Sequence, residues 1–584
     1  MKSVTILTIA AMAMAAATGC SHDNPTPSPE PPVKGGEFNE FGFTTTAPVT
    51  LSVDYGDMAG MPANVYFEVY DTCPVEETET AYAKIAGVEP LYAGYTDGQG
   101  RFEGTIELPA YIRKAYVLTP AFYARTLLEA TRSGDMLTAS AESGAPANAA
   151  PASTRAKEYH STAVERDGWK TWLGSYDTTY GSIGYEYDGD LKVKNYGALL
   201  KAHASVFDTT KKCPKEYRSS RDLYLEKSAE VVITLLGSNT CWNSSMGYYY
   251  YKTGNKPKSL ADANVVMIFP NTQDGRWSNS PWESRLYQGV ERGTAVQLIY
   301  YPEIADGSKA GATTVFPADY RIGFVLATNA WTNRLRAGDK KYRAATSDGL
   351  SVNNNGVAYQ TPRTAVFRYT DKKSGINSVL FSFEDHTNDE NFSDVVFTMT
   401  SNPVDAVTDI PSVDVNDGKK TANVLRGIYA FEDLWPSRGD YDMNDVMVRS
   451  DYEKVFNEKG VFEESFMLKT FANFAGNANG LAVTLTGAAA DAKLEFSVRK
   501  PGAETFEAAD FERDGKVVLL TPDVKETMGA TYRITAKYDA PVAEAQAGTI
   551  KPFIYRTDRD GLTAGKRWEV HIPVSYTHLE PTRP

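Results

Sequence analysis

One pattern of short, oxygen-bearing side chains occurs twice in this chain of 584 residues. Residues 383–394 read F-E-D-H-T-N-D-E-N-F-S-D, and residues 431–445 read F-E-D-L-W-P-S-R-G-D-Y-D-M-N-D. Both copies open on Phe-Glu-Asp and close on D-x-[DN]-x-[SN]-D. Alternating carboxylate, amide and hydroxyl oxygens in a tight loop are the ligands that a hard cation such as Ca²⁺ prefers. The pattern therefore predicts a calcium loop that is used twice.

Aligning the two copies on their last aspartate identifies the candidate metal ligands. The first loop offers Asp389, Asn391, Ser393 and Asp394, with Glu384 or Asp385 from the opening. The second loop offers Asp440, Asp442, Asn444 and Asp445, with Glu432 or Asp433 from the opening. Neither copy has the glycine and the distal glutamate of an EF-hand loop. Apolar, β-favouring residues flank both copies, so we expect each loop to join two strands.

Two other interpretations of these loops stay open. Asp, Asn, Ser and Gly also make ordinary turns, and an acidic turn without metal would suffice for a single copy. The carboxylates could instead act as a catalytic pair, as they do in glycosidases. Repetition of the whole set of oxygen ligands favours a metal, because neither a turn nor a catalytic pair needs the D-x-D-x-N arrangement.

Composition predicts a mostly β protein of about three domains, each able to bury a core. The chain has 74 acidic and 60 basic residues and no long basic run, which argues against a nucleic acid partner. Aromatic residues make up 12% of the chain, and short β-branched runs outnumber helical periodicities. The predicted fold is a series of β-sandwich-like domains on a lipid-anchored N-terminal tether.

The first 20 residues have the features of a targeting segment. Lys2 is followed by an apolar run, Val4 to Ala17, and by the small-residue sequence Ala-Thr-Gly before Cys20. This arrangement resembles a bacterial lipoprotein signal, in which Cys20 becomes the lipidated first residue. An ordinary secretory peptide is the alternative, but the Pro-rich tether that follows favours the lipid anchor. We expect a location at the outer membrane, where Asp23 favours the outer face without deciding it.

The remaining cysteines give few constraints. Cys213 and Cys241 could pair in an oxidising compartment and leave Cys73 buried, but the sequence does not decide their state. There is no C-x-x-C sequence, which argues against a cysteine-type zinc site.

Changes in composition divide the chain into segments. We expect a signal peptide at 1–20, a Pro-rich tether at 21–37, a small β-sandwich at 38–122, a linker at 123–159, a larger β-sandwich domain with the first acidic loop at 160–400, a connection at 401–422, a third β domain with the second acidic loop at 423–573, and a tail at 574–584. Asp97 to Gly100 reads as a hairpin turn. The four tyrosines Tyr248 to Tyr251 read as core packing rather than a glycan platform.

The long second motif resembles the LruC-domain family of bacterial lipoproteins. The resemblance rests on A-F-E-D-L-W-P-S (430–437) and G-D-Y-D-M-N-D (439–445), supported by segments at 316–326 and 568–573. The first motif is similar to a second domain of unknown function that often precedes it. The resemblance covers residues 40–573 and implies localisation and architecture rather than chemistry, because the family has no established activity. Family members continue beyond that point, so we expect a truncated third domain and a non-native tail.

Motifs of common enzymes are missing from the sequence. It contains no H-E-x-x-H, G-x-S-x-G or G-x-x-x-x-G-K-[ST], which removes the usual support for zinc peptidases, α/β-hydrolases and P-loop enzymes. His386 follows the first Phe-Glu-Asp, but the second copy has Leu434 there, which favours a variable loop position. We therefore expect a calcium-stabilised, surface-anchored binding or adhesion protein with a glycan or protein ligand. A glycan-acting extracellular hydrolase with paired carboxylates is the alternative.

Overall fold

The computed structural model describes residues 46–571, with gaps at 57–62, 78–81, 142–158, 161–168, 178–179, 220, 241, 274–288, 332–342, 348, 354, 372–374, 386–388, 414–417, 436–442 and 559–565. Strands dominate this part of the chain, as the composition predicted, and its longest helix is α1 (Tyr196–Val206). In the described residues, no helix has the length and apolar character of a membrane span. Cys20 and the tether lie outside the described residues.

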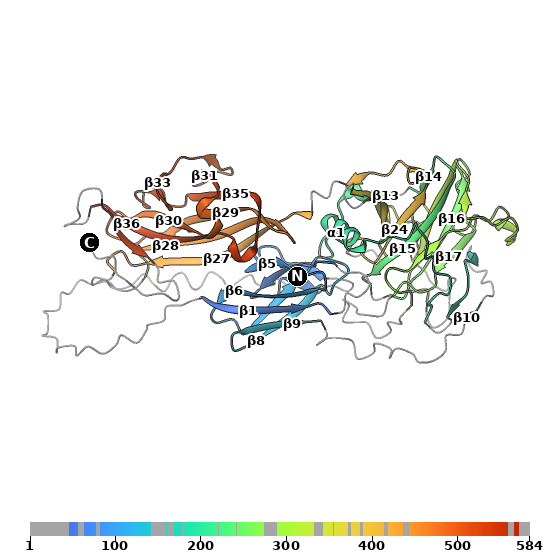
Figure 1. Ribbon diagram of the computed structural model, residues 1–584, viewed down its shortest axis with the longest axis horizontal. Coiled ribbons are helices and arrows are strands. Elements are labelled where there is room, and N and C mark those ends of the chain that lie inside the picture. Colours follow the sequence, from blue (N-terminus) through green and yellow to red (C-terminus); the bar gives the residue numbers. More distant parts are fainter. Residues whose placement is uncertain are drawn as a thin grey trace, which may run out of the picture. The chain divides into compact units, whose positions relative to one another are not determined.

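The N-terminal strands form a seven-stranded sheet with the order β5-β2-β7-β8-β9-β1-β6 (Figure 1). Its members are β1 (Thr46–Asp54), β2 (Tyr66–Tyr70), β5 (Tyr92–Tyr95), β6 (Arg101–Pro109), β7 (Lys114–Leu118), β8 (Leu127–Ser133) and β9 (Met136–Ser140), with β3 (Val75–Glu77) and β4 (Tyr82–Lys84) as a separate pair. The sheet curls on itself, because the ring of Phe67 in β2 lies 5.1 Å from the ring of Phe102 in β6 at the far end of the strand order. The two ends therefore share one core.

Two expectations for this region need correction. The sheet continues to Ser140, past the boundary expected at residue 122, because β8 and β9 complete it instead of starting a linker. The turn at Asp97–Gly100 is present, and Asp97 Oδ1 accepts the N–H of Gln99 at 2.8 Å. However, the turn does not close a hairpin, because β5 pairs with β2 and β6 pairs with β1.

The middle domain is a sandwich of two sheets. One sheet contains β11 (Trp169–Trp172), β17 (Val265–Phe269), β16 (Ser245–Lys252), β20 (Tyr320–Ala327), β14 (Leu223–Leu225), β25 (Val407–Thr408) and β21 (Arg343–Ala345). The other contains β13 (Arg218–Ser219), β22 (Thr364–Asp371), β23 (Ile376–Phe383), β24 (Val395–Asn402), β15 (Ala229–Ser238), β18 (Ala295–Gln297), β19 (Val315–Phe316) and β26 (Ser412–Val413). The ring of Phe324 lies 5.3 Å from Phe381 and 5.1 Å from Phe397, so the core joins the two sheets. A further pair is β10 (Tyr159–His160) with β12 (Tyr176–Asp177).

The tyrosine run at Tyr248–Tyr251 lies in β16 and packs in the core, as its sequence suggested. Tyr248 and Tyr249 are fully buried. Two of the hydroxyls anchor a buried carboxylate, since Tyr249 Oη and Tyr251 Oη donate to the Asp222 oxygens at 3.3 and 2.8 Å. Thr346 Oγ1 also donates to Asp222 at 2.5 Å, which keeps this buried acidic group hydrogen-bonded.

Helix α1 covers the outer face of the sheet that carries the first acidic loop. Asn195 caps its first turn by accepting the N–H of Ala198 at 3.2 Å. Near the helix end, His203 Nε2 lies 2.9 Å from Ser382 Oγ of β23, and the ring of Phe207 packs 5.8 Å from that of Phe367. Burial lowers the pKa of His203 to about 3, because the charged ring would lose its solvation.

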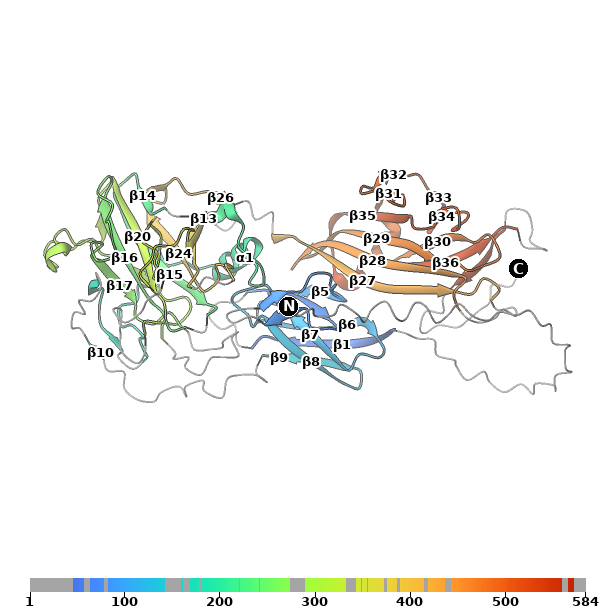
Figure 2. The same ribbon diagram turned by 180° about the vertical axis from the view of Figure 1, so that it is seen from behind.

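The C-terminal domain is a second two-sheet sandwich. One sheet contains β27 (Lys420–Phe431), β28 (Val446–Asn457), β29 (Gly460–Ala472), β35 (Thr531–Val542), β31 (Lys493–Arg499) and β32 (Glu507–Ala508), and the other contains β33 (Glu512–Asp514), β34 (Val517–Thr521), β30 (Gly480–Thr486), β36 (Thr549–Arg556) and β37 (Trp568–His571). Figure 2 shows β27, β28 and β29 side by side from behind. Strand β28 alternates buried and half-buried residues, as a strand with one face on a core should.

The connection expected at 401–422 is shorter in the structure. Strands β25 and β26 belong to the middle sandwich, and β27 already begins at Lys420. The short helices η2 (Lys215–Tyr217), η3 (Ile304–Asp306), η5 (Gly487–Asp491) and η6 (Glu544–Gln546) complete the described elements. The tail at 574–584 lies outside the described residues.

The cysteines do not form the pair that the sequence left open. Cys73 and Cys213 are free thiols, and Cys241 lies outside the described residues. Burial raises the pKa of the Cys213 thiol to about 12, so this side chain stays protonated and unreactive at neutral pH.

The buried His203 predicts an acid-sensitive fold. The pKa of His203 in the folded state lies below its unfolded value of about 6.5, so the unfolded chain binds the extra proton first. The contribution of His203 to stability is therefore present above pH 6.5 and decreases as the pH falls from there toward 3. In urea unfolding, the free energy of unfolding of the wild type should fall by about 1.4 kcal/mol per pH unit more than that of His203→Gln as the pH decreases through this window. If the free energy of unfolding changes with pH equally in both proteins, the prediction is wrong.

Candidate metal centres

Both acidic loops join neighbouring antiparallel strands, as the flanking residues predicted. The first loop connects β23 to β24, where Phe383 pairs with Val395. The second connects β27 to β28, where Phe431 pairs with Val446. The Phe of Phe-Glu-Asp is therefore opposite the residue that follows the last aspartate in both copies. The two loops occupy equivalent positions in two different sheets.

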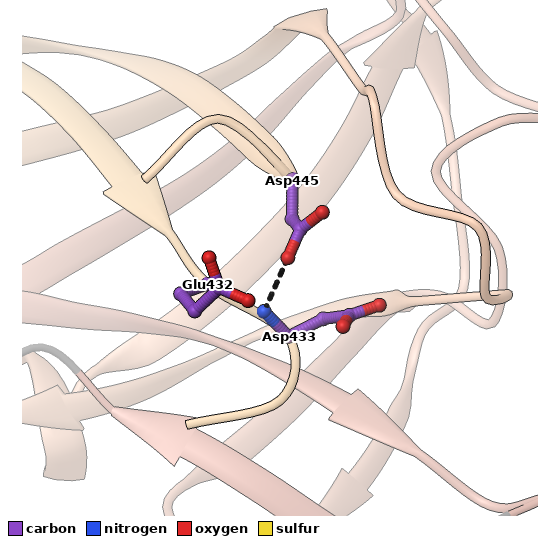
Figure 3. A group of neighbouring side chains, drawn as sticks. All are labelled: Glu432, Asp433 and Asp445. Carbon is purple, nitrogen blue, oxygen red and sulfur yellow. Dashed lines mark hydrogen bonds between the residues drawn. The ribbon is translucent and has the colours of Figure 1, made fainter. Parts of the chain in front are cut away.

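One hydrogen bond closes both loops in the same way. The backbone N–H of Asp385 donates to Asp394 Oδ2 at 2.6 Å, and that of Asp433 donates to Asp445 Oδ2 at 2.8 Å. Figure 3 shows the second case, in which Asp445 reaches from the start of β28 to the Asp433 N–H. In each copy the last aspartate is thereby held beside the Glu-Asp pair.

A second shared feature is a left-handed residue two positions before the last aspartate. Phe392 has a φ of 58° and Met443 a φ of 54°. Bulky residues avoid this region, at a cost of about 1–3 kcal/mol, unless the surroundings enforce it. The same left-handed conformation at matching positions shows that the two loops share a backbone turn as well as a closing hydrogen bond.

The first loop concentrates acidic groups inside the protein. Glu384, Asp385 and Asp394 are at least 94% buried, and Asp389 is partly buried. Asn391 joins them, since its Nδ2 donates to Asp389 Oδ2 at 2.9 Å and its Oδ1 accepts the Ser393 N–H at 2.8 Å. All six predicted ligands of the first loop are therefore linked by hydrogen bonds or by shared burial, Ser393 included.

Few cationic or donor groups balance this negative charge. Arg363, at the start of β22, places Nη2 3.3 Å from Glu384 Oε1, with both side chains buried. Thr240 Oγ1 donates to Asp385 Oδ2 at 2.6 Å. Glu390 of the same loop pairs with Arg218 and Lys212 at 3.3 Å. The other four carboxyl groups, those of Glu384, Asp385, Asp389 and Asp394, face one buried guanidinium.

Burial dominates the electrostatics of the first loop. It raises the pKa of Glu384 well above its usual range, and the Asp389 charge adds to this rise while Arg363 opposes it. Burial also raises the pKa of Asp385 to about 6 and that of Asp394 well above normal. These carboxyl groups resist ionisation unless another positive charge is present, and a divalent cation would supply it.

The second loop brings three carboxyl groups within reach of one ion. One oxygen each of Glu432, Asp433 and Asp445 lie within 4.8 Å of one another (Figure 3). Glu432 and Asp433 are buried, whereas Asp445 and the neighbouring Asn444 are partly buried. The remaining predicted ligands, Asp440 and Asp442, lie outside the described residues.

Three further groups belong to these sites and were missed from the sequence. Arg363 pairs with Glu384 in the first loop, whereas Asn477 and Asn479 each donate Nδ2 to Asp433 Oδ2 at 2.9 Å in the second. Both asparagines lie in the N-F-A-G-N-A-N segment (473–479) between β29 and β30. The spaced asparagines of this segment carry the same kind of oxygen ligand as the two motifs. Their spacing was the feature of the sequence that could have identified them as part of the site. Nothing near Arg363 in the sequence marks its role.

The geometry suits ion binding better than acid–base catalysis. A glycosidase pair must face a substrate, but the carboxyl groups of the first loop are enclosed by protein. Clustered carboxylate and amide oxygens at one end of a hairpin are instead the donor set of a Ca²⁺ site. Such a site would also offset the surplus of buried negative charge.

Two segments match families whose function is unknown. Residues 47–141 match the family described as DUF8469, and residues 316–402 match DUF4114, each a domain of unknown function. The second match includes the whole first acidic loop. No curated protein matches the chain.

Similarity to solved structures is weak. A protein from Eubacterium rectale described as secreted is 8% identical, with a TM-score of 0.11, over 56% of this chain and 64% of that one. The B domain of a biofilm-associated protein is 8% identical, with a TM-score of 0.12, over 65% and 82%. The match spans less than two thirds of the secreted protein, and at these scores neither likeness carries an argument.

The buried ion pair of the first loop gives a direct test of its charge balance. Arg363→Met should destabilise the protein by about 3–5 kcal/mol, because Glu384 loses its buried partner. The double variant Arg363→Met with Glu384→Gln should recover most of this loss. Urea unfolding of the three proteins in chelator measures both effects, and a double variant as unstable as the single one would contradict the pairing.

Proposed function

We propose that this chain is an envelope-anchored lipoprotein of the LruC-domain family that binds or adheres to an extracellular ligand, with two Ca²⁺ ions stabilising its hairpin loops. Asp389, Asn391, Ser393 and Asp394 serve the first ion with Glu384 or Asp385. Asp440, Asp442, Asn444 and Asp445 serve the second with Glu432 or Asp433. The proposal rests above all on the hydrogen bond that closes both loops identically around a surplus of buried carboxyl groups.

Charge supports the cation at the first loop. Several carboxyl groups share one buried environment with a single guanidinium, and an unpaired buried charge costs several kcal/mol. Protons can neutralise these groups in acid, but near neutral pH a divalent cation is the more effective counter-charge. Short Asp, Asn and Ser side chains supply the oxygens that Ca²⁺ prefers over softer metals.

The position of each loop suggests what the ion does. Phe383–Val395 and Phe431–Val446 are the last ladder pairs before the loops, so an ion there would hold the strand ends together. Extracellular calcium modules bind at about 10⁻⁴–10⁻³ M, the range found outside cells. The loops would then be ordered outside the cell, where a surface protein meets its ligand.

Anchoring and family membership form the other half of the proposal. The lipobox-like segment ending at Cys20 and the Pro-rich tether support attachment to the outer membrane. The second motif, including Phe431 and the G-D-Y-D-M-N-D segment, supports membership of the LruC-domain family. The match of residues 316–402 to a domain of unknown function is consistent with the expected partner domain.

Calcium should stabilise the whole chain measurably. At a free Ca²⁺ concentration about 100 times the dissociation constant, each site adds about 2.7 kcal/mol to the free energy of unfolding. Chelator should therefore lower the melting temperature. Asp394→Asn should remove the contribution of the first site, and Asp442→Ala with Asp445→Ala that of the second. Asp188→Asn is the matched control, since its side chain is 92% exposed and lies outside both loops. If chelator leaves the melting temperature unchanged and calorimetry shows no heat of Ca²⁺ binding, the two loops are acidic turns without a metal.

The lipid anchor has a separate test. Cys20→Ser removes the acceptor of the lipid, so the protein should move from the membrane fraction to the soluble extract of its host cell. Immunoblots of both fractions measure the change. A Cys20→Ser protein that stays with the membrane would contradict the anchor. Protease treatment of intact cells carrying the wild type then shows which face of the outer membrane it occupies.

A further inference from the structure

Three cationic side chains lie together on one sheet of the C-terminal domain. Arg533 belongs to β35, and the two strands beside it, β29 and β31, carry Lys469 and Arg499 (Figure 2). Thr531, two residues before Arg533, pairs with both Lys469 and Arg499. Lys469 and Arg499 are therefore diagonal neighbours of Arg533 on the same side of the sheet, at about 7–8 Å. We call these three residues the cationic face.

The cationic face points away from the core of the domain. Leu468 and Ile534, the residues adjacent to Lys469 and Arg533 in their strands, are buried in that core. Successive side chains of a strand point to opposite sides, so the cations lie on the other side of the sheet. Lys469 is exposed, and Arg499 and Arg533 are half-buried. A ligand in solution can therefore reach all three.

An aromatic ring holds the two guanidinium groups in place. The guanidinium carbon of Arg533 lies 3.8 Å from the centre of the Phe506 ring, and that of Arg499 lies 5.0 Å from it. The ring attracts the cations but accepts no ordinary hydrogen bond from their N–H groups. Arg533 Nε has no hydrogen-bond partner, and its Nη2 makes only a weak contact with Met467 Sδ at 3.8 Å. The N–H groups of this pair are therefore available to an acceptor from outside.

Several carboxylates of the same sheet already have cations of their own. The ion pairs are Asp451 with Arg449 at 2.9 Å, Glu495 with Lys537 at 2.7 Å and Glu507 with Lys500 at 3.0 Å. Within the described residues, no ion pair joins a carboxylate to any member of the cationic face. Two guanidinium groups on one ring repel each other, and an external anion relieves that repulsion. The planar guanidinium fork matches a carboxylate, to which it can donate two hydrogen bonds.

An exposed aromatic side chain follows the cations in β29. Phe471 is 44% exposed, two residues after Lys469, and Thr470 between them is fully buried. Phe471 and Lys469 therefore lie on the same side of the strand. The apolar face of a sugar ring packs well on such a ring. Cations and an aromatic side chain together suit a ligand that has both carboxylates and sugar rings.

We propose that the cationic face binds an acidic polysaccharide, a chain of sugars that carries carboxylate groups. Arg499 and Arg533 bind carboxylates through their N–H groups, Lys469 binds a further one, and Phe471 contacts a sugar ring. This inference names a ligand class for the binding role proposed above and requires neither calcium site. An anionic membrane is a poorer partner, because the chain has a net charge of −14 and the whole molecule is repelled by such a surface.

The full-length chain tests the proposal on three immobilised polysaccharides, polygalacturonate, alginate and hyaluronan. The buffer contains chelator, so that Ca²⁺ cannot bridge the protein to the ligand. Wild-type protein should bind at least one of the three, and rising salt should weaken the binding. Methyl-esterified polygalacturonate and the methyl esters of the other two are the matched ligands, because they keep the sugars and lose the charge. They should bind about tenfold more weakly or not at all.

Variants assign the binding to the cationic face. Arg499→Gln with Arg533→Gln should weaken it about tenfold or more. The matched control is Arg221→Gln with Lys227→Gln, which removes the same charge from exposed side chains of the middle domain and should bind as the wild type does. Lys469→Gln should weaken binding several-fold, and its exposed side chain makes this the variant that leaves the fold unchanged. Melting curves confirm that each variant is folded.

Four results would overturn the cationic face as the binding site. They are no binding to any of the three acidic polysaccharides, equal binding to their methyl esters, binding that survives both the Arg499–Arg533 double variant and Lys469→Gln, and binding to phosphatidylglycerol vesicles alone. Wild-type protein that Ca²⁺ stabilises but that binds no acidic polysaccharide would overturn this inference and leave the calcium sites standing. Binding in chelator by a protein that Ca²⁺ does not stabilise would do the reverse.

Discussion

The bond from the last aspartate of each motif to the N–H of the Phe-Glu-Asp aspartate is the constraint on which both candidate sites depend. It fixes Asp394 and Asp445 beside a glutamate and an aspartate from the opposite strand. Acidic groups that repel one another are thereby held together. The left-handed conformations of Phe392 and Met443 belong to the same arrangement, because the chain must turn sharply before that aspartate.

Equivalent loops have been placed in different surroundings. The first lies within the middle sandwich, where Arg363 and Thr240 contact its carboxyl groups and burial raises their pKa values. The second is bordered by the asparagine-bearing segment between β29 and β30 and by exposed aromatic rings. The two loops therefore differ in burial and in the groups that balance their charge, while the hydrogen bond that closes them is the same.

Local patterns predicted the strands well but not their partners. The strands that flank both acidic loops, β23 and β24 in one sheet and β27 and β28 in another, follow from their apolar, β-favouring residues. The prediction of a hairpin at Asp97–Gly100 was wrong, because the same turn residues can join two paired strands or two strands that lie apart in the sheet. Which of the two forms depends on the partners of the flanking strands, and here β5 pairs with β2 and β6 with β1. Likewise, β8 and β9 looked like a linker, since only the sheet they complete explains their burial.

The sequence by itself determined the mostly β fold, the two acidic loops and the strands that flank them, because side-chain type and alternation are local properties. Only the tertiary structure decided which oxygens converge. Arg363 meets Glu384 because β22 pairs with β23. Asn479 meets Asp433 because the segment between β29 and β30 lies beside the second loop. It also decided that Asp394 is buried and Asp445 partly buried, because burial depends on what the rest of the fold packs around each residue.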